Sequence, residues 1–147
     1  MSHSRTGSTQ ALTDAAIRAA RHAAGDDVEI RARSAFDAGP QDVLWAHGIL
    51  LCTPANFGYM SGALKDFFER VYYPCLERTA GLPYALVVKG STDVDGAVAS
   101  VERIITAMGW RRVLPPLTVV GDAGEADLER ATELGATLAA GLAAGIF

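Results

Sequence analysis

A segment dense in hydroxyl side chains stands near the start of the chain and leads into a stretch with helical periodicity. Its residues are Ser4, Arg5, Thr6, Gly7, Ser8 and Thr9. A helix N-terminus carries unpaired N–H groups and a partial positive charge. Hydroxyls and a glycine in front of it form a cradle for a phosphate. A simple N-cap is the other interpretation, although a cap needs only one hydroxyl.

A second segment with binding chemistry follows the run that we expect to be the most buried strand. Proline there fixes the exit of the chain from the strand. Asparagine and glycine permit backbone angles that turn N–H groups toward a ligand, and two aromatic rings offer flat faces to a planar heterocycle. Alternatively, the two rings pack in the hydrophobic core or in a contact between subunits. The residues are Pro54, Ala55, Asn56, Phe57, Gly58 and Tyr59.

A third polar loop, residues 89–96, follows another buried run and includes Gly90 and Ser91. It closes over the same ligand, or it only caps the next helix through Thr92 or Asp95. Its carboxylates should not lie against a phosphate, so we expect it at the other end of the ligand. The three histidines form no catalytic set with other residues, which suits a protein whose cofactor carries the chemistry.

The apolar pattern switches repeatedly between strand-like runs and helical periodicity. We expect strands over residues 28–35, 48–53, 84–89 and 117–120, and helices over 9–24, 41–45, 64–76, 98–108 and 128–142. Buried strands that alternate with helices predict one α/β domain, residues 1–147, with a parallel sheet between two helical layers. Ligands of such sheets bind where the strands end, which is where the three segments lie.

Composition narrows the function classes. Half of the 147 residues are apolar, 20% are charged and the net charge is −4, which argues against a nucleic-acid partner. No apolar stretch reaches the length that crosses a bilayer, and no secretory signal is evident, so we expect a cytoplasmic protein without a membrane partner. Cys52 and Cys75 lack the spacing of metal ligands, so we expect both to be buried and no metal site.

Neither a P-loop nor a GxGxxG pattern is present, but two other motifs point to a known family. Ser4–Thr9 resembles the flavodoxin phosphate loop, T/S-x-T-G-x-T. Thr53–Lys65 resembles the P-x-[YF]-[GN]-x-[MP]-[SP]-[GA]-x-[LM]-K stretch of flavodoxin-like NAD(P)H-dependent FMN reductases and quinone reductases. The order of the two motifs on an α/β pattern strengthens the resemblance.

This resemblance implies a flavodoxin-like three-layer sandwich with strand order 2-1-3-4-5 and FMN at the carboxyl ends of the strands. The first segment, Ser4 to Thr9, would hold the FMN phosphate. Pro54, Ala55, Asn56, Phe57 and Gly58 would line the ring and the ribityl chain, and Gly90 and Ser91 would touch the ring. The resemblance also allows two copies to pair through the helix that carries Tyr72 and Tyr73.

The implied activity is oxidoreduction: NAD(P)H would reduce the flavin, which would pass electrons to a quinone, a flavin or another small acceptor. Two alternatives stay open. One is an electron carrier without its own NAD(P)H reaction, and the other is a flavin-free relative with a binding role. The third loop lacks the aromatic pattern of electron-carrier flavodoxins, which favours the reductase.

The expected first strand is short. Only Met1, Ser2 and His3 precede the phosphate segment, whereas a strand usually has about five residues. We therefore expect a truncated first strand, with the strands at 28–35 and 48–53 either facing a gap or closing up on each other. Either arrangement predicts marginal stability and weak FMN binding.

Overall fold

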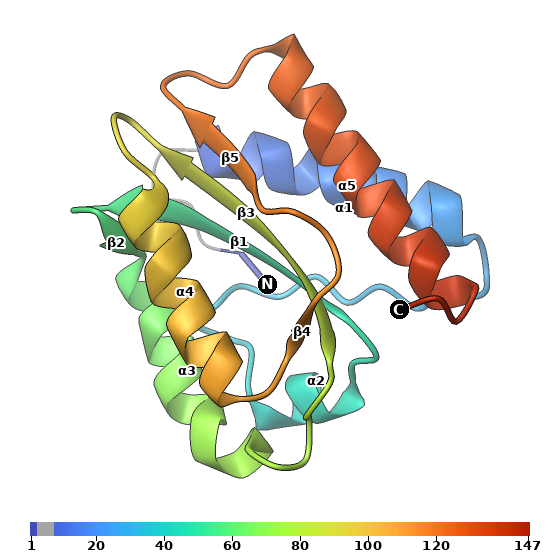
Figure 1. Cartoon of the computed structure of the whole chain (residues 1–147). Helices are drawn as coiled ribbons and strands as arrows, with labels where there is room; N and C mark the ends of the chain where they lie inside the picture. Colours follow the sequence, from blue (N-terminus) through green and yellow to red (C-terminus); the bar gives the residue numbers. More distant parts are fainter. Residues whose placement is uncertain (3–7) are drawn as a thin grey trace.

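A computed structural model describes residues 1–2 and 8–147, with the side chain of Ser8 left out. The elements, in chain order, alternate between helices and strands over most of the chain (Figure 1). They are α1 (Ser8–Ala24), α2 (Pro40–Trp45), β1 (Ile49–Asn56), β2 (Tyr59–Met60), α3 (Gly62–Cys75), β3 (Pro83–Gly90), α4 (Asp95–Ala107), β4 (Arg111–Arg112), β5 (Leu117–Val120) and α5 (Glu125–Ala143). None of the helices within the described ranges combines the length and apolarity that crossing a bilayer requires.

The sheet is parallel except for β2. Strand β1 pairs with β3 from Ile49 opposite Tyr84 to Pro54 opposite Lys89. The other edge of β3 pairs first with β4 and then, toward Gly90, with β5. These two short strands form one edge strand with a break between them, where Pro115 and Pro116 cannot donate ladder hydrogen bonds.

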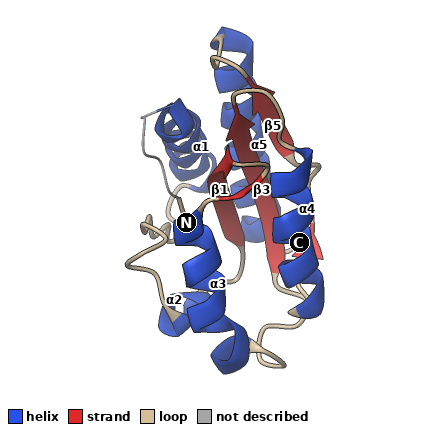
Figure 2. Ribbon diagram, turned by 90° about the vertical axis from the view of Figure 1, so that its left-hand side faces the viewer, coloured by secondary structure: helices blue, strands red, loops and turns tan. Residues whose placement is uncertain are grey.

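Helices cover both faces of the sheet (Figure 2). Alternate strand residues point to opposite faces. Leu51, Leu86 and Val88 pack into a core with α2, α3 and α4. Cys52, Ala85 and Val87 pack into a second core with α1 and α5. The predicted α/β three-layer architecture is therefore confirmed, and both cysteines are buried, as expected.

Helices α1 and α5 approach each other very closely on their face of the sheet. A Cβ placed on Gly135 would lie 2.1 Å from the carbonyl oxygen of Ala16. Only glycine at this position allows the two helix backbones to pack at that distance. Helices α1 and α5 together form the helical layer on this face of the sheet.

The place of the expected first strand is held, within the described residues, by Met1 and Ser2 alone. Ser2 forms parallel bridges to Ser34 on one side and to Cys52 on the other. The Ser2 N–H donates to the Arg33 carbonyl at 3.2 Å, and the Cys52 N–H donates to the Met1 carbonyl at 2.9 Å. The neighbouring segments therefore stay apart here and do not close into a four-stranded sheet.

The predicted strand at residues 28–35 requires correction. The structure has no strand there, only a single bridge at Ser34. A strand is defined by its hydrogen-bonded partner. Among the described residues, this segment has a partner only where Ser2 lies beside it. The alternating apolar pattern thus indicated the path of the chain but not its pairing.

Candidate functional site

The carboxyl ends of the parallel strands meet at one edge of the sheet. Strands β1, β3 and β5 end there at Asn56, Gly90 and Val120. Helix α1 begins near the arrowheads of β3 and β5 (Figure 1). Three segments that sequence patterns marked for binding are therefore attached to this edge, because each follows a strand or opens α1.

The second predicted segment is a tight hairpin instead of a plain loop. Strand β1 continues to Asn56, the chain reverses, and Asn56 pairs with Tyr59 in antiparallel β2. Phe57 and Gly58 form the turn, with φ angles of 53° and 68°. Two consecutive left-handed residues are typical of a type I′ hairpin turn.

Phe57 is an unusual residue for that turn. Bulky residues rarely adopt a left-handed conformation, which costs roughly 1–2 kcal/mol. Its side chain is also fully exposed at 108%, so no packing within the described chain offsets the strain. Strain that the fold does not need is often retained for binding. Tyr59 is also exposed, at 43%.

Helix α4 and strand β1 fix the position of the hairpin. The Met60 N–H donates to Ser100 Oγ at 3.2 Å, and the Ser61 N–H donates to Thr53 Oγ1 at 3.0 Å. A Cβ on Gly96 would lie 2.1 Å from the Gly58 carbonyl oxygen. The turn therefore rests directly on the first turn of α4.

The third segment lies against the hairpin through Gly90. A Cβ on Gly90 would lie 2.5 Å from the Asp93 carbonyl oxygen and 3.1 Å from the Ala55 Cβ. The Gly90 carbonyl accepts a hydrogen bond from the Gly121 N–H at 2.9 Å. The small size of Gly90 thus serves contacts between loops. The next residues, Ser91 and Thr92, are exposed and make no hydrogen bond within the described part of the chain.

The first segment is only partly described. Ser4, Arg5, Thr6 and Gly7 lie outside the described residues, so their predicted phosphate contacts stay predictions. Ser8 is the first residue of α1. Thr9 is 2% exposed, and its carbonyl accepts a hydrogen bond from Thr13 Oγ1 at 2.9 Å. Little of the Thr9 side chain is open to a ligand from solvent.

The described residues suit a flavin mononucleotide. Phe57 and Tyr59 offer exposed aromatic faces for a planar ring. The backbone N–H groups of Ser91 and Thr92, which make no hydrogen bond in the described residues, could donate to ring oxygens. The N-terminus of α1 could accept a terminal phosphate. Pro54, Ala55 and Asn56 are half-buried behind the hairpin tip, where they form one wall. The donors and the aromatic rings come from different elements and meet at one edge.

Two strongly buried titratable groups lie in the interior, beside the first-strand position. Burial raises the pKa of the Cys52 thiol, an effect that the nearby Met1 amino group partly opposes. Burial lowers the pKa of that amino group, which donates a hydrogen bond to the Leu50 carbonyl at 2.6 Å. Sequence patterns gave no signal for this arrangement, because it depends on where the chain end lies in the fold.

Comparison with known proteins identifies the class of fold. No known family profile matches the chain. A flavodoxin of Aquifex aeolicus (strain VF5) is 36% identical over 67 residues, which is 46% of this chain and 35% of that protein. The matched stretch thus spans about a third of the curated relative.

Solved structures resemble nearly the whole chain. A flavodoxin from the domain Archaea superposes with a TM-score of 0.80 at 16% identity, over 94% of this chain and 92% of that one. A flavodoxin, WrbA-like protein from Agrobacterium tumefaciens gives 0.77 at 18% identity, over 98% and 94%. The chain therefore has the flavodoxin-like fold. At these identities the likeness establishes the fold alone, and the reductase subtype expected from Thr53–Lys65 stays a prediction.

Proposed function

We propose that this chain binds FMN at the carboxyl edge of its sheet and transfers electrons through it. The observation that carries the proposal is the packing of the strained hairpin tip on Gly96. Gly96 ends the loop in which the backbone of Ser91 and Thr92 makes no hydrogen bond within the described residues. The hairpin belongs to Thr53–Lys65, which resembles a stretch of flavodoxin-like FMN and quinone reductases, and that resemblance implies ring contacts from Gly90 and Ser91. The similarity to proteins named flavodoxins supports the same function.

The chain would supply orientation, and FMN would supply the redox chemistry. Phe57 and Tyr59 would lie against the ring, and the N–H groups of Ser91 and Thr92 would donate to its oxygens. Ser4 to Thr9, at the start of α1, would hold the phosphate. The close contact of Gly58 with Gly96 would keep the hairpin at a fixed distance from the third loop.

A titration of the apoprotein with FMN and with riboflavin tests this proposal. Charge-assisted hydrogen bonds to a phosphate are each worth about 1.5–3 kcal/mol, so riboflavin should bind at least ~10-fold more weakly than FMN. Flavin fluorescence reports both affinities. Equal affinities would show that the protein does not bind the phosphate group, and no binding of either flavin would reject the proposal.

A second candidate function is NAD(P)H-dependent oxidoreduction with a quinone or flavin as acceptor. The resemblance of Thr53–Lys65 to FMN and quinone reductases favours it. Anaerobic stopped-flow mixing of the flavin-loaded protein with NADH or NADPH separates the two candidates. Direct bleaching of the flavin supports the reductase. Bleaching only after addition of a separate flavodoxin reductase supports a carrier.

A further inference from the structure

Lys89 is the next-to-last residue of β3, close to the carboxyl edge of the sheet. It stands opposite Pro54 of β1 on one side and opposite Val119 of β5 on the other. Both Val119 and Val87, which lies two positions before Lys89, belong to the core with α1 and α5. Because strand residues alternate between the two faces, the Lys89 side chain lies on the α1–α5 face.

The first turn of α1 lies at the same end of this face. Leu12 of α1 packs in the core that contains Val87, and α1 begins near the arrowheads of β3 and β5 (Figure 1). Thr9, about one helical turn closer to the start of α1, is buried at 2% exposure. The Lys89 side chain therefore approaches the carboxyl edge beside the N-terminus of α1.

The Lys89 ammonium has no counter-charge within the chain. The residue is half-buried, and it forms no hydrogen bond or ion pair with any of the described residues. Residues 3–7 include no Asp or Glu that could pair with it. Charges that leave water usually have a partner, and the N-terminus of α1 is itself partly positive. Two positive groups that converge at one edge are complementary to an anion from outside the chain.

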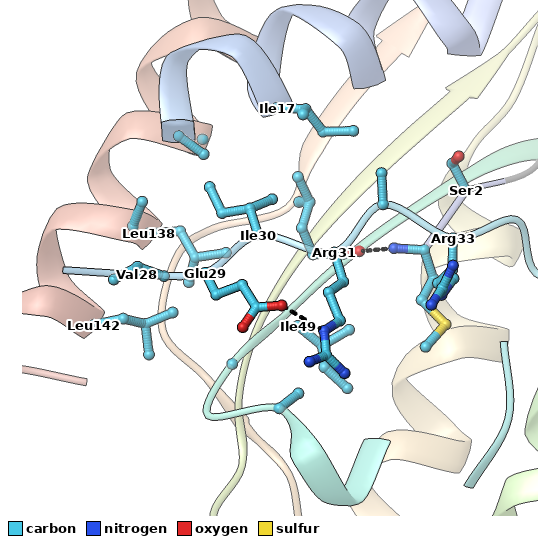
Figure 3. A pocket seen from close by; sticks show the side chains of 18 of the residues that line it. Ser2, Ile17, Val28, Glu29, Ile30, Arg31, Arg33, Ile49, Leu138 and Leu142 are labelled. Atoms are coloured by element: carbon cyan, nitrogen blue, oxygen red, sulfur yellow. Dashed lines mark hydrogen bonds and ion pairs between the residues drawn. The ribbon is translucent and has the colours of Figure 1, made fainter. Parts of the chain in front are cut away.

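The other described cations are paired with carboxylates or lie away from this edge. Arg31 pairs with Glu29 at 2.8 Å beside the apolar pocket at the start of β1, which is the opposite end of that strand (Figure 3). Lys65 pairs with Glu69 on α3. The arginines that have no partner in the described residues lie in the second halves of helices, after α3, or in β4: Arg18, Arg21, Arg78, Arg103 and Arg111.

The hairpin and Lys89 lie toward opposite faces of the sheet edge. The hairpin turn rests on α4 through the contact between Gly58 and Gly96, and α4 packs on the face opposite α1 and α5. A ligand that spans this edge would have its planar part at the hairpin and its anionic part near Lys89. FMN has this form, with the ring at one end and the phosphate at the other.

We propose that Lys89 supplies the positive charge that neutralises the terminal phosphate of FMN. This inference rests on the proposed FMN site and adds a charged group to it, since the phosphate contacts expected from the sequence are hydroxyls and backbone N–H groups. A phosphate monoester carries about two negative charges near neutral pH, and a lysine ammonium binds it as a point charge. The bound phosphate also relieves the repulsion between the ammonium and the N-terminus of α1.

Titrations with FMN and riboflavin, followed by flavin fluorescence, test the proposal on three variants. Lys89→Met keeps the aliphatic stem but removes the charge, so FMN should bind at least ~10-fold more weakly while riboflavin binds as in the wild type. Lys89→Arg keeps the charge and should retain most of the FMN affinity. Arg18→Met removes an exposed, unpaired charge from the second half of α1 and should change neither affinity. Melting curves verify that all three variants fold.

Salt dependence gives a second measurement. The ratio of the FMN Kd of Lys89→Met to that of the wild type should shrink between about 0.1 M and about 1 M salt, because the screening length falls from roughly 10 Å to roughly 3 Å. An equal loss for both flavins, an equal loss in Arg18→Met, or a salt-independent ratio would each overturn the role of Lys89. If the wild type prefers FMN to riboflavin and Lys89→Met keeps that preference, Lys89 has no such role but the proposed function stands. If the wild type binds neither flavin, both proposals fail.

Discussion

Gly96→Ala should displace the hairpin that the proposed FMN site uses. Gly96 is the second residue of α4, and a Cβ there would lie 2.1 Å from the Gly58 carbonyl oxygen and 3.2 Å from its carbon. Carbon–oxygen contacts settle near 3.3 Å or more, so the turn must move by roughly 1 Å. Backbone cannot yield as a flexible side chain does, and the added methyl therefore pushes the whole tip away from α4.

The expected cost follows from two opposing effects. Overpacking of this kind costs roughly 1–3 kcal/mol, and alanine recovers at most about 1 kcal/mol of helix propensity. The net loss of unfolding free energy should be about 1–2 kcal/mol, which lowers Tm by roughly 2–4 °C for each kcal/mol. Displacement of the tip should also weaken FMN binding about tenfold, the equivalent of one lost contact of about 1.4 kcal/mol.

Gly62→Ala is the matched control. Gly62 is the first residue of α3, and nothing lies within 4 Å of a Cβ placed there. This variant should keep the wild-type FMN affinity and keep or slightly raise the Tm, because alanine favours the helix more than glycine does. Thermal melts and flavin titrations of both variants, with hydrogen exchange at residues 57–60, complete the test. If Gly96→Ala matches Gly62→Ala in all three measurements, the hairpin does not depend on the contact with α4 in the way argued above.

Three further perturbations test the packing of the fold. Ser61→Ala should lower the unfolding free energy by about 0.5–2 kcal/mol because Ser61 Oγ caps α3 by accepting the Leu64 N–H at 3.2 Å; chemical denaturation checks this, and no loss would contradict the cap. Stability should rise as pH increases toward 8, since burial lowers the pKa of the Met1 amino group and the unfolded chain binds more protons there. Above about 9 it should fall, because burial raises the pKa of Cys52; Tm measured from pH 6 to 10 would expose a flat profile. A strand of about five apolar residues fused before Met1 should raise Tm by pairing with residues 28–32, whose backbone makes no hydrogen bond in the described part of the chain; a fusion of alternating Gly and Ser should not raise it.

The sequence patterns predicted well those features that depend on neighbouring residues along the chain, namely the type and bounds of most helices and strands. The strand at 117–120 has the predicted bounds, and the helices begin and end within a few residues of expectation. The reason is physical: continuous apolar runs and 3.6-residue periodicity directly encode burial on two faces or on one. The order of these elements then leaves few topologies.

Strand pairing and tight turns were harder to predict from the sequence. The hairpin at Phe57 and Gly58 was expected as a loop, because a phenylalanine at a left-handed position is not a recognised turn signal. Strand β4 gave no pattern at all, since Arg111 and Arg112 are exposed and pair over only two residues. The segment at 28–35 has a strand-like sequence, but the described residues offer it a pairing partner only at Ser2.

The candidate site was predicted from residue types at the ends of strands, and the described part of it does gather at one edge. What the patterns could not give was the role of each glycine. Gly90 was predicted to contact the ligand, which stays a prediction, and the structure shows that its missing Cβ also admits Asp93 and Ala55. Close approach between backbones depends on distances that only the folded chain defines.

Strands β4 and β5 form an interrupted edge of the sheet beside β3, and this interruption has a consequence for self-association. A long, flat edge strand can recruit the edge of another sheet and start amyloid-like assembly. Here the edge consists of two-residue β4 with its arginines, a proline pair, and four-residue β5. The Arg130 side chain also covers the Thr118 carbonyl at 3.5 Å. No stretch of this edge is long enough to template a foreign strand, so the outer border of the sheet is protected against aggregation.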